Sequence, residues 1–310
     1  MSDSPTSKSS NMSAVSSAAG TERKSSTEKH AGKIERTFRA LADVGELGLI
    51  AYITAGDPSL EASAKIVLAA AEAGADIIEL GVPFSDPVAD GPVIQRASDR
   101  ALRSGTTLAG VLELVRLLRI RTDVPLVLFS YFNPILQMGL EKFAEAAASA
   151  GADGVLATDL TPEEAGEYRA ALRARGLDTI FLAAPTSTDE RLARIAEAST
   201  GFLYLVSRTG VTGTREVLPE GLPALARRVR KFTGLPIAVG FGISAPAHMS
   251  VLGGIADAAV VGSALMAEVE RSASAEAAST SVAALVRALK SAARSGLSRR
   301  SNQLENPAAE

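Results

Sequence analysis

The chain has 310 residues, of which 46% are hydrophobic, and its formal net charge at pH 7 is −3. The complete absence of cysteine excludes disulfides, thiolate metal sites and cysteine nucleophiles, and the slightly acidic charge with scattered Lys and Arg argues against nucleic-acid binding. No uninterrupted apolar run reaches eighteen residues, so no segment is suited to spanning a bilayer, and we expect a soluble, cytoplasmic protein.

Residues 1–31 differ in composition from the rest of the chain. They include ten serines and no Leu, Ile or Phe, which is too little apolar surface to offset the entropy of ordering. We therefore expect a disordered tail. It has no apolar core of a secretory signal, and Asp3, Glu22 and Glu28 argue against an organellar transit peptide, although the serine content keeps that alternative open.

The ordered part is expected to begin near Lys33 with a short amphipathic helix, since Ile34, Phe38 and Leu41 recur at helical spacing. From there the sequence repeats one unit: a short apolar run, a loop rich in Gly, Pro and Asp, and an amphipathic helix that ends near Gly. The expected strands are residues 49–53, 75–80, 126–130, 154–157, 179–183, 202–206, 237–239 and 258–261.

The repeated unit predicts the fold class. Strands that are apolar almost throughout are buried on both faces, which is typical of a parallel sheet covered by helices. Eight such units in about 235 residues fit a closed (β/α)8 TIM barrel, with an extra N-terminal helix, better than an open doubly wound sheet. We expect the barrel to occupy residues 32–295, with a closing helix at about 281–294 and a flexible C-terminal tail at 296–310.

Two carboxylates in the stretch 79–95 are candidates for catalysis. Glu79 lies in the apolar run of the second strand, where an ionised group loses several kcal/mol of hydration unless it is paired or protonated. Asp90 lies in the loop that follows, which prolines and glycines make stiff. Both belong to the carboxyl ends of the strands, where barrel enzymes have their active sites. The alternative is a satisfied core carboxylate and aspartates that only cap turns.

Glycine-rich loops after the late strands predict a phosphate site. They are residues 210–213, 240–244 and 262–264, and the seventh and eighth strands end at the last two. Free backbone N–H groups can converge there on an oxyanion without a basic side chain. Ordinary turn glycines are the alternative.

Aromatic and branched residues at strand ends could line a pocket for a flat apolar group, or they could be core. From the pattern alone the two interpretations are about even. These residues are Tyr52, Phe129, Tyr131, Leu182 and Phe241.

With these motifs in place, the chain resembles the tryptophan synthase alpha chain family from about residue 33 to 295. The resemblance is carried by six motifs in order: residues 51–58, 79–95, 130–134, 207–213, 240–244 and 262–264. It implies a lyase of tryptophan biosynthesis that cleaves indole-3-glycerol phosphate by a retro-aldol reaction to indole and glyceraldehyde 3-phosphate.

The resemblance also implies roles for individual residues. Glu79 would be the general acid and base, and Asp90 would stabilise the indole N–H as positive charge develops. Tyr204 would orient Glu79 or pack against the ring, and Thr212 would meet Asp90 when a mobile lid closes. The implied phosphate contacts are Gly213, Gly242, Gly262 and Ser263, and the implied indole-pocket wall is Tyr52, Phe129 and Leu182, with Tyr131 and Phe241 nearby.

The resemblance further implies a partner. The alpha chain would pass indole to a tryptophan synthase beta chain, in an alpha2beta2 heterotetramer, through loops around Asp86 and Thr212. Pyridoxal phosphate would belong to the beta chain only, and this chain would need no cofactor and no metal.

Two other functions remain as alternatives. The first is a catalytically weak phosphate-binding subunit that activates the beta chain, against which the presence of Glu79 and Asp90 argues. The second is an aldolase with a Schiff-base lysine. The sequence disfavours it, because the lysines after residue 32 lie in helical patterns rather than at strand ends.

Overall fold

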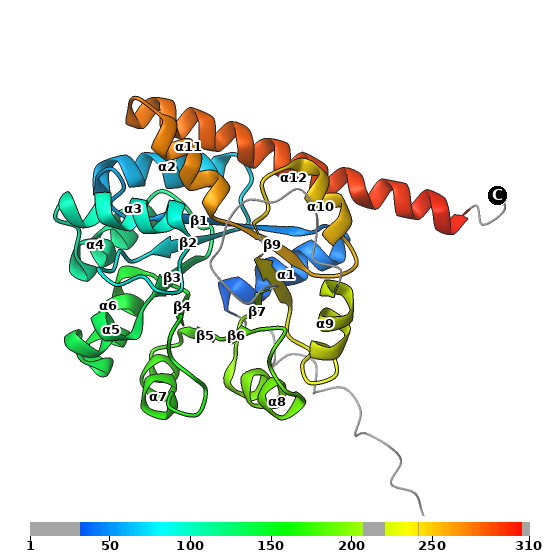
Figure 1. Cartoon of the computed structure of the whole chain (residues 1–310), viewed down its shortest axis with the longest axis horizontal. Coiled ribbons are helices and arrows are strands. Elements are labelled where there is room, and N and C mark those ends of the chain that lie inside the picture. The colour runs from blue at the N-terminus through cyan, green and yellow to red at the C-terminus, as the bar shows by residue number, and fades with distance from the viewer. Residues whose placement is uncertain (1–31, 207–220, 241, 306–310) are drawn as a thin grey trace, which may run out of the picture. The chain divides into compact units, whose positions relative to one another are not determined.

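The computed structural model describes residues 32–206, 221–240 and 242–305, with side chains described up to residue 294. Within these residues nine parallel strands form one sheet that helices surround (Figure 1). The strands are β1 (Gly48–Thr54), β2 (Ile77–Gly81), β3 (Leu126–Ser130), β4 (Gly154–Ala157), β5 (Asp178–Ile180), β6 (Leu182–Ala183), β7 (Leu203–Val206), β8 (Ile237–Gly240) and β9 (Ala258–Val261).

The sheet closes into a barrel through one divided strand. The strand order is β5-β4-β3-β2-β1-β9-β8-β7-β6, and β5 and β6 are separated in sequence only by Phe181. β5 pairs with β4, β6 pairs with β7, and the Phe181 carbonyl accepts a hydrogen bond of 3.1 Å from the Tyr204 N–H. The fifth predicted strand therefore serves both neighbours, and the predicted eight-unit barrel is confirmed.

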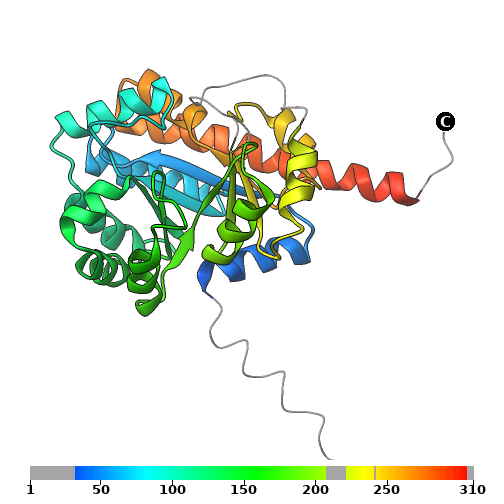
Figure 2. The same ribbon diagram turned by 60° about the horizontal axis from the view of Figure 1, so that its bottom comes forward.

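The helices form the outer layer in the views of Figures 1 and 2. No helix among the described residues is long and apolar enough to cross a membrane. The helices are α1 (Lys33–Asp43), α2 (Leu60–Glu72), α3 (Pro92–Arg103), α4 (Leu108–Arg119), α5 (Phe132–Met138), α6 (Leu140–Ala150), α7 (Gly166–Ala174), α8 (Asp189–Ala198), α9 (Leu222–Val229), α10 (Pro246–Leu252), α11 (Ser263–Arg271) and α12 (Ala275–Glu305).

The closing helix α12 is longer than the sequence pattern predicted. It begins six residues before the expected start at 281, because the Ser274 hydroxyl accepts a hydrogen bond of 3.2 Å from the Ala277 N–H and caps the first turn. It ends at Glu305, so the segment expected as a tail from residue 296 begins inside this helix. The predicted boundaries of the closing helix were wrong at both ends.

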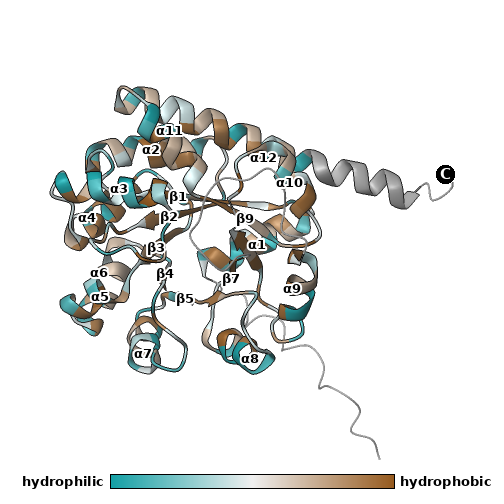
Figure 3. Cartoon of the chain, in the orientation of Figure 1, coloured by the Kyte–Doolittle hydropathy of each residue, from teal (hydrophilic) through white to brown (hydrophobic). Residues whose placement is uncertain are grey.

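The hydrophobic core has two parts, and Figure 3 shows in brown the hydrophobic strands that contribute to both. One part lies between the strands and the helices. The other fills the barrel interior and includes Ile50, Ile77 and Val127 from three adjacent strands. Ile34 and Phe38 of α1 belong to this interior part, so the extra N-terminal helix closes the end of the barrel opposite the carboxyl ends of the strands.

An aspartate repeated before three strands joins neighbouring units at this closed end. Asp153 precedes β4, and its Oδ2 accepts hydrogen bonds from the Leu126 N–H of β3 at 2.9 Å and from Arg119 Nη2 of α4 at 2.7 Å. One carboxylate thus satisfies the first N–H of the neighbouring strand and binds the end of a helix. The same arrangement recurs at Asp76 with Leu49 and Lys290, and at Asp257 with Ile237 and Arg230.

We predict that Asp153→Ala lowers the free energy of unfolding by about 2 kcal/mol, because a buried N–H and a guanidinium lose their acceptor. Asp153→Asn should lower the free energy of unfolding by less, since the amide oxygen still accepts a hydrogen bond from the Leu126 N–H. Burial raises the pKa of the Asp153 carboxyl, so the charge that Asn removes is itself disfavoured there. Urea unfolding measures both, with the fully exposed Asp123→Ala as the control. If Asp153→Ala and Asp153→Asn lower the free energy of unfolding equally, the hydrogen bond from the Leu126 N–H is not the source of the stabilisation.

Candidate active site

Glu79 lies in the middle of β2 with its side chain inside the barrel. The residue is 0% exposed, and neither carboxylate oxygen has a hydrogen-bond partner among the described residues. Its register partners are Tyr52 on β1 and Val127 on β3. Burial raises the pKa of Glu79 to about 8, so the carboxyl is protonated at neutral pH. Within the described residues the Glu79 carboxyl therefore differs from the satisfied core carboxylate that was the alternative interpretation.

Two glycines make room for tyrosine rings near Glu79. A Cβ at Gly81 would lie 2.1 Å from Tyr52 Oη, and a Cβ at Gly240 would lie 2.5 Å from Tyr204 Oη. Both distances are far below a van der Waals contact, so the rings occupy space that a side chain would otherwise take. The missing side chains at two strand ends therefore help to shape the interior beside Glu79.

The two tyrosines are close to both candidate carboxylates. Burial raises the pKa of Tyr52 and of Tyr204 well above the ordinary tyrosine value, and the charges of Glu79 and Asp90 raise both pKa values further. A desolvated interior strengthens such interactions, which still weaken as the separation of the groups grows, and Tyr52 pairs in register with Glu79. Tyr52, Tyr204, Glu79 and Asp90 therefore form one group at the mouth of the barrel.

Asp90 is held in its loop by side chains from two directions. Tyr131, the residue before α5, donates its hydroxyl hydrogen to Asp90 Oδ2 at 3.1 Å, and Tyr131 Oη accepts a hydrogen bond of 3.0 Å from the Ala89 N–H. Gln95 of α3 donates to the Asp90 carbonyl at 2.9 Å. The Tyr131 ring stacks on Phe84 with ring centroids 4.9 Å apart. The loop is thus held by specific bonds as well as by its prolines.

The two carboxyl groups differ in protonation. Burial raises the pKa of Asp90 to about 6, and the Tyr131 hydrogen bond opposes this rise. At neutral pH Asp90 is therefore mostly ionised while Glu79, with a pKa of about 8, holds its proton. A proton donor and a carboxylate in one site are the pair that acid–base catalysis requires.

Apolar side chains complete the wall of the site. The rings of Tyr52 and Phe129 meet edge to face, with centroids 5.2 Å apart. Leu182 on β6 pairs in register with Tyr204 on β7, and both are only partly buried. The structure therefore brings together four of the predicted pocket residues, and Tyr131 joins them through Asp90.

Three of the four predicted phosphate residues, Gly242, Gly262 and Ser263, follow the last two strands. Gly262 precedes α11 and Ser263 is its first residue, so the free N–H groups of this helix start there. Gly242 follows β8 with a φ of 81°, a left-handed conformation that favours glycine. A Cβ at Gly262 would lie 3.3 Å from the Tyr52 ring. Three further predicted residues, Thr212, Gly213 and Phe241, lie outside the described residues.

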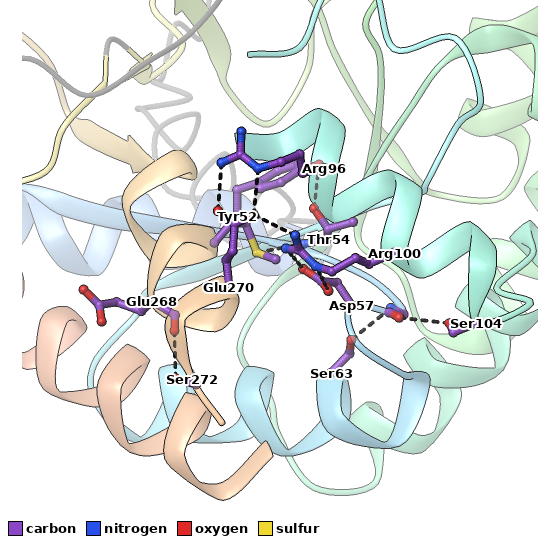
Figure 4. Close-up of polar contacts among 12 residues, drawn as sticks. Tyr52, Thr54, Asp57, Ser63, Arg96, Arg100, Ser104, Glu268, Glu270 and Ser272 are labelled. Atoms are coloured by element: carbon purple, nitrogen blue, oxygen red, sulfur yellow. Dashed lines mark hydrogen bonds and ion pairs between the residues drawn. The ribbon is translucent and has the colours of Figure 1, made fainter. Parts of the chain in front are cut away.

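Sequence reasoning missed three contributors to this region. Gln95 was part of the diagnostic stretch, but nothing in its spacing indicated a bond to Asp90. The ion pair between Asp57 and Arg100, shown in Figure 4, was also missed, because the two residues are 43 positions apart. A charged residue in a loop after an apolar strand, as Asp57 is, was the one available signal.

The fold is a (β/α)8 barrel, and the two carboxyl groups, one protonated and one ionised at neutral pH, form its candidate acid–base site. The sequence model of the family described as tryptophan synthase alpha chain matches residues 38–294. A tryptophan synthase alpha chain from Solibacter usitatus is 52% identical over 258 residues, which are 83% of this chain and 97% of that one. One from Dechloromonas aromatica is 52% identical over 82% of this chain and 95% of its own.

Solved structures of tryptophan synthases show the same fold. A chain of Mycobacterium tuberculosis tryptophan synthase has a TM-score of 0.79 at 38% identity and covers 85% of this chain and 99% of its own length. The tryptophan synthase subunit alpha of Legionella pneumophila has a TM-score of 0.78 at 36% identity, covering 86% and 99%. The chain belongs to the tryptophan synthase alpha chain family. It is a lyase of tryptophan biosynthesis that cleaves indole-3-glycerol phosphate to indole and glyceraldehyde 3-phosphate.

The raised pKa of Glu79 predicts a pH-dependent stability. Because the folded-state pKa of about 8 lies above the ordinary value of 4.5, the contribution of Glu79 to folding stability is fully present below pH 4.5 and is lost as the pH rises through 8. Glu79→Gln cannot ionise, so its stability relative to the wild type should rise by on the order of 3 kcal/mol between pH 5 and 8.

Urea unfolding at several pH values measures this difference. The exposed Glu72→Gln, at the end of α2, is the control and should show no such trend. A difference between Glu79→Gln and the wild type that stays constant from pH 5 to 8 would show that the Glu79 carboxyl is not desolvated.

Proposed function

We propose that Glu79 and Asp90 divide the proton transfers of the retro-aldol cleavage between them. The observation that carries this proposal is the pairing of a fully buried carboxyl without a hydrogen-bond partner with a half-buried carboxylate held by Tyr131. The first group is protonated and the second ionised at neutral pH, since their pKa values are about 8 and about 6. The catalytically weak activating subunit is not favoured.

The proposed reaction begins with the indole ring. The Glu79 carboxyl gives its proton to the ring carbon that bears the glycerol side chain, and the Asp90 carboxylate stabilises the positive charge that develops at the ring N–H. Glu79, now ionised, takes the proton of the adjacent side-chain hydroxyl. The carbon–carbon bond then breaks, its electrons return to the ring, and indole and an aldehyde form. Glu79 ends the cycle protonated, as it began.

The remaining site residues bind the substrate in this proposal. Backbone N–H groups at the late strand ends hold the phosphate, and the aromatic and apolar wall holds the indole ring. Thr212 meets Asp90 when the site closes. The proposed phosphate contacts are Gly213, Gly242, Gly262 and Ser263, and the proposed ring contacts are Tyr52, Phe129, Tyr131, Leu182, Tyr204 and Phe241.

The proposed partner is a tryptophan synthase beta chain in an alpha2beta2 heterotetramer, which family membership supports. Exposed residues on the loop before Asp90 provide a surface for it: Asp86 is exposed and Val88 is 70% exposed. Pyridoxal phosphate belongs to the beta chain in this proposal, and the alpha chain uses neither a cofactor nor a metal. We place the complex in the cytoplasm, with residues 32–295 as the catalytic domain; the tail expected at 1–31 lies outside the described residues.

Single replacements of the two carboxylates test the roles. Glu79→Gln and Asp90→Asn should each lower kcat for indole release by about 10²- to 10⁴-fold, the usual contribution of one acid–base group. A spectroscopic assay of indole formation, with saturating beta chain added, measures both. Glu72→Gln should retain full activity, and near-normal turnover in either active-site variant would refute its role.

The Tyr131 hydrogen bond predicts a shift in the pH profile. kcat/KM should require ionised Asp90 and protonated Glu79, so it should fall below about pH 6 and above about pH 8. Because the Tyr131 hydroxyl lowers the pKa of Asp90, Tyr131→Phe should move the acidic limb to higher pH and leave the basic limb in place.

The matched control for Tyr131→Phe is Tyr168→Phe on α7. Tyr168 is also buried, and its hydroxyl has no hydrogen-bond partner among the described residues. Its replacement should leave both limbs of the profile unchanged. An acidic limb that is identical in Tyr131→Phe and the wild type would show that the hydroxyl does not tune Asp90.

A further inference from the structure

A chain of four alternating charges joins three elements beside the site (Figure 4). Asp57, in the loop after β1, accepts two hydrogen bonds of 2.8 Å from Arg100 of α3. Arg100 donates a third, also of 2.8 Å, to Glu270 of α11. Glu270 in turn accepts bonds of 2.7 and 2.8 Å from Arg96, one turn earlier on α3. Two carboxylates and two guanidinium groups thus form one continuous network.

The network is partly buried, which distinguishes it from ordinary surface ion pairs. The Asp57 side chain is only 1% exposed, and those of Arg100 and Glu270 are 30% and 28% exposed. Bidentate bonds from a guanidinium fix both distance and orientation. The two Arg groups lower the pKa of Glu270 to about 2, chiefly through the hydrogen bonds from Arg96. Glu270 is therefore ionised throughout the physiological range.

The two joined helices begin at the two ends of the proposed substrate site. α3 starts at Pro92, directly after Asp90 and Gly91, and Gln95 in its first turns binds the Asp90 carbonyl. α11 starts at Ser263, beside the proposed phosphate contact Gly262. Since a helix is stiff over two or three turns, a bond between the helix bodies also limits how far apart their starts can move.

A comparison within α3 shows what is special about these contacts. Arg103 and Asp99 form an exposed pair four residues apart on the same helix, so it joins no separate elements. Pairs of that kind contribute little. Arg96 and Arg100 instead reach α11, which packs directly against α3.

We propose that Asp57, Arg100, Glu270 and Arg96 set the separation between the Asp90 loop and the phosphate-binding start of α11. They are positioning residues for a ligand whose ring and phosphate must reach both ends at once. This inference rests on the proposed function, because the phosphate contacts come from it. The network acts on the distance between two subsites and leaves each subsite itself intact.

This positioning role can be tested with two ligands, one that contacts both subsites and one that contacts only the phosphate subsite. The ligand that spans both ends is indole-propanol phosphate, an uncleavable substrate mimic, and the fragment that occupies one end is glycerol 3-phosphate. Glu270→Gln removes the charge that joins α11 to α3 and leaves the Asp57–Arg100 pair in place. Calorimetry should show binding of the spanning ligand weakened about tenfold and that of the fragment by less than about twofold, because only the spanning ligand depends on the distance.

Arg103→Gln is the matched control on the same helix, and it should leave both affinities at the wild-type values. A thermal melt checks that Glu270→Gln remains folded at the titration temperature. Equal weakening of both ligands, or no weakening of either, would overturn the inference while leaving the proposed function intact. Failure of the wild-type chain to bind indole-propanol phosphate would instead refute the proposed function and this inference with it.

Discussion

The closed ladder of parallel strands is the constraint on which the rest of the molecule depends. Closure occurs at Phe181, where one strand leaves β4 and pairs with β7. A closed sheet has no edge, and its interior is shielded from water on all sides except its two ends. A carboxyl group placed on an inward-facing position is therefore desolvated by the fold itself. The high pKa of Glu79 needs no charged neighbour, since burial alone accounts for it.

The two ends of the barrel are built differently. At the end covered by α1, the repeated aspartates satisfy backbone N–H groups and pair with basic side chains, so the polar groups have partners within the protein. At the other end, within the described part of the chain, the Glu79 carboxyl has no hydrogen-bond partner, and the Asp90 carboxylate accepts a hydrogen bond from Tyr131. The buried carboxyl that a substrate could satisfy therefore lies at the end of the barrel away from α1.

The sequence predicted the repeating features well and the long-range ones poorly. Apolar runs located the eight units, because strand burial on both faces leaves a pattern in every unit. Glu79 could be found since a lone charge interrupts such a run. Two other contacts could not be predicted from the sequence: the hydrogen bond from Tyr131 to Asp90 and the ion pair of Asp57 with Arg100. Each joins residues about forty positions apart, and whether they meet depends on how the units pack. The division of the fifth strand at Phe181 also leaves no local pattern.

The glycines beside the tyrosine rings have a consequence for how this chain can change over time. Tyr52 Oη occupies the space of a side chain at position 81, and Tyr204 Oη does the same at position 240. A methyl group at either position would require the tyrosine ring beside it to move. If the tyrosine is first exchanged for a smaller residue, the same methyl group becomes acceptable. The cost of replacing each glycine therefore depends on whether its tyrosine is still present, so the two positions are coupled.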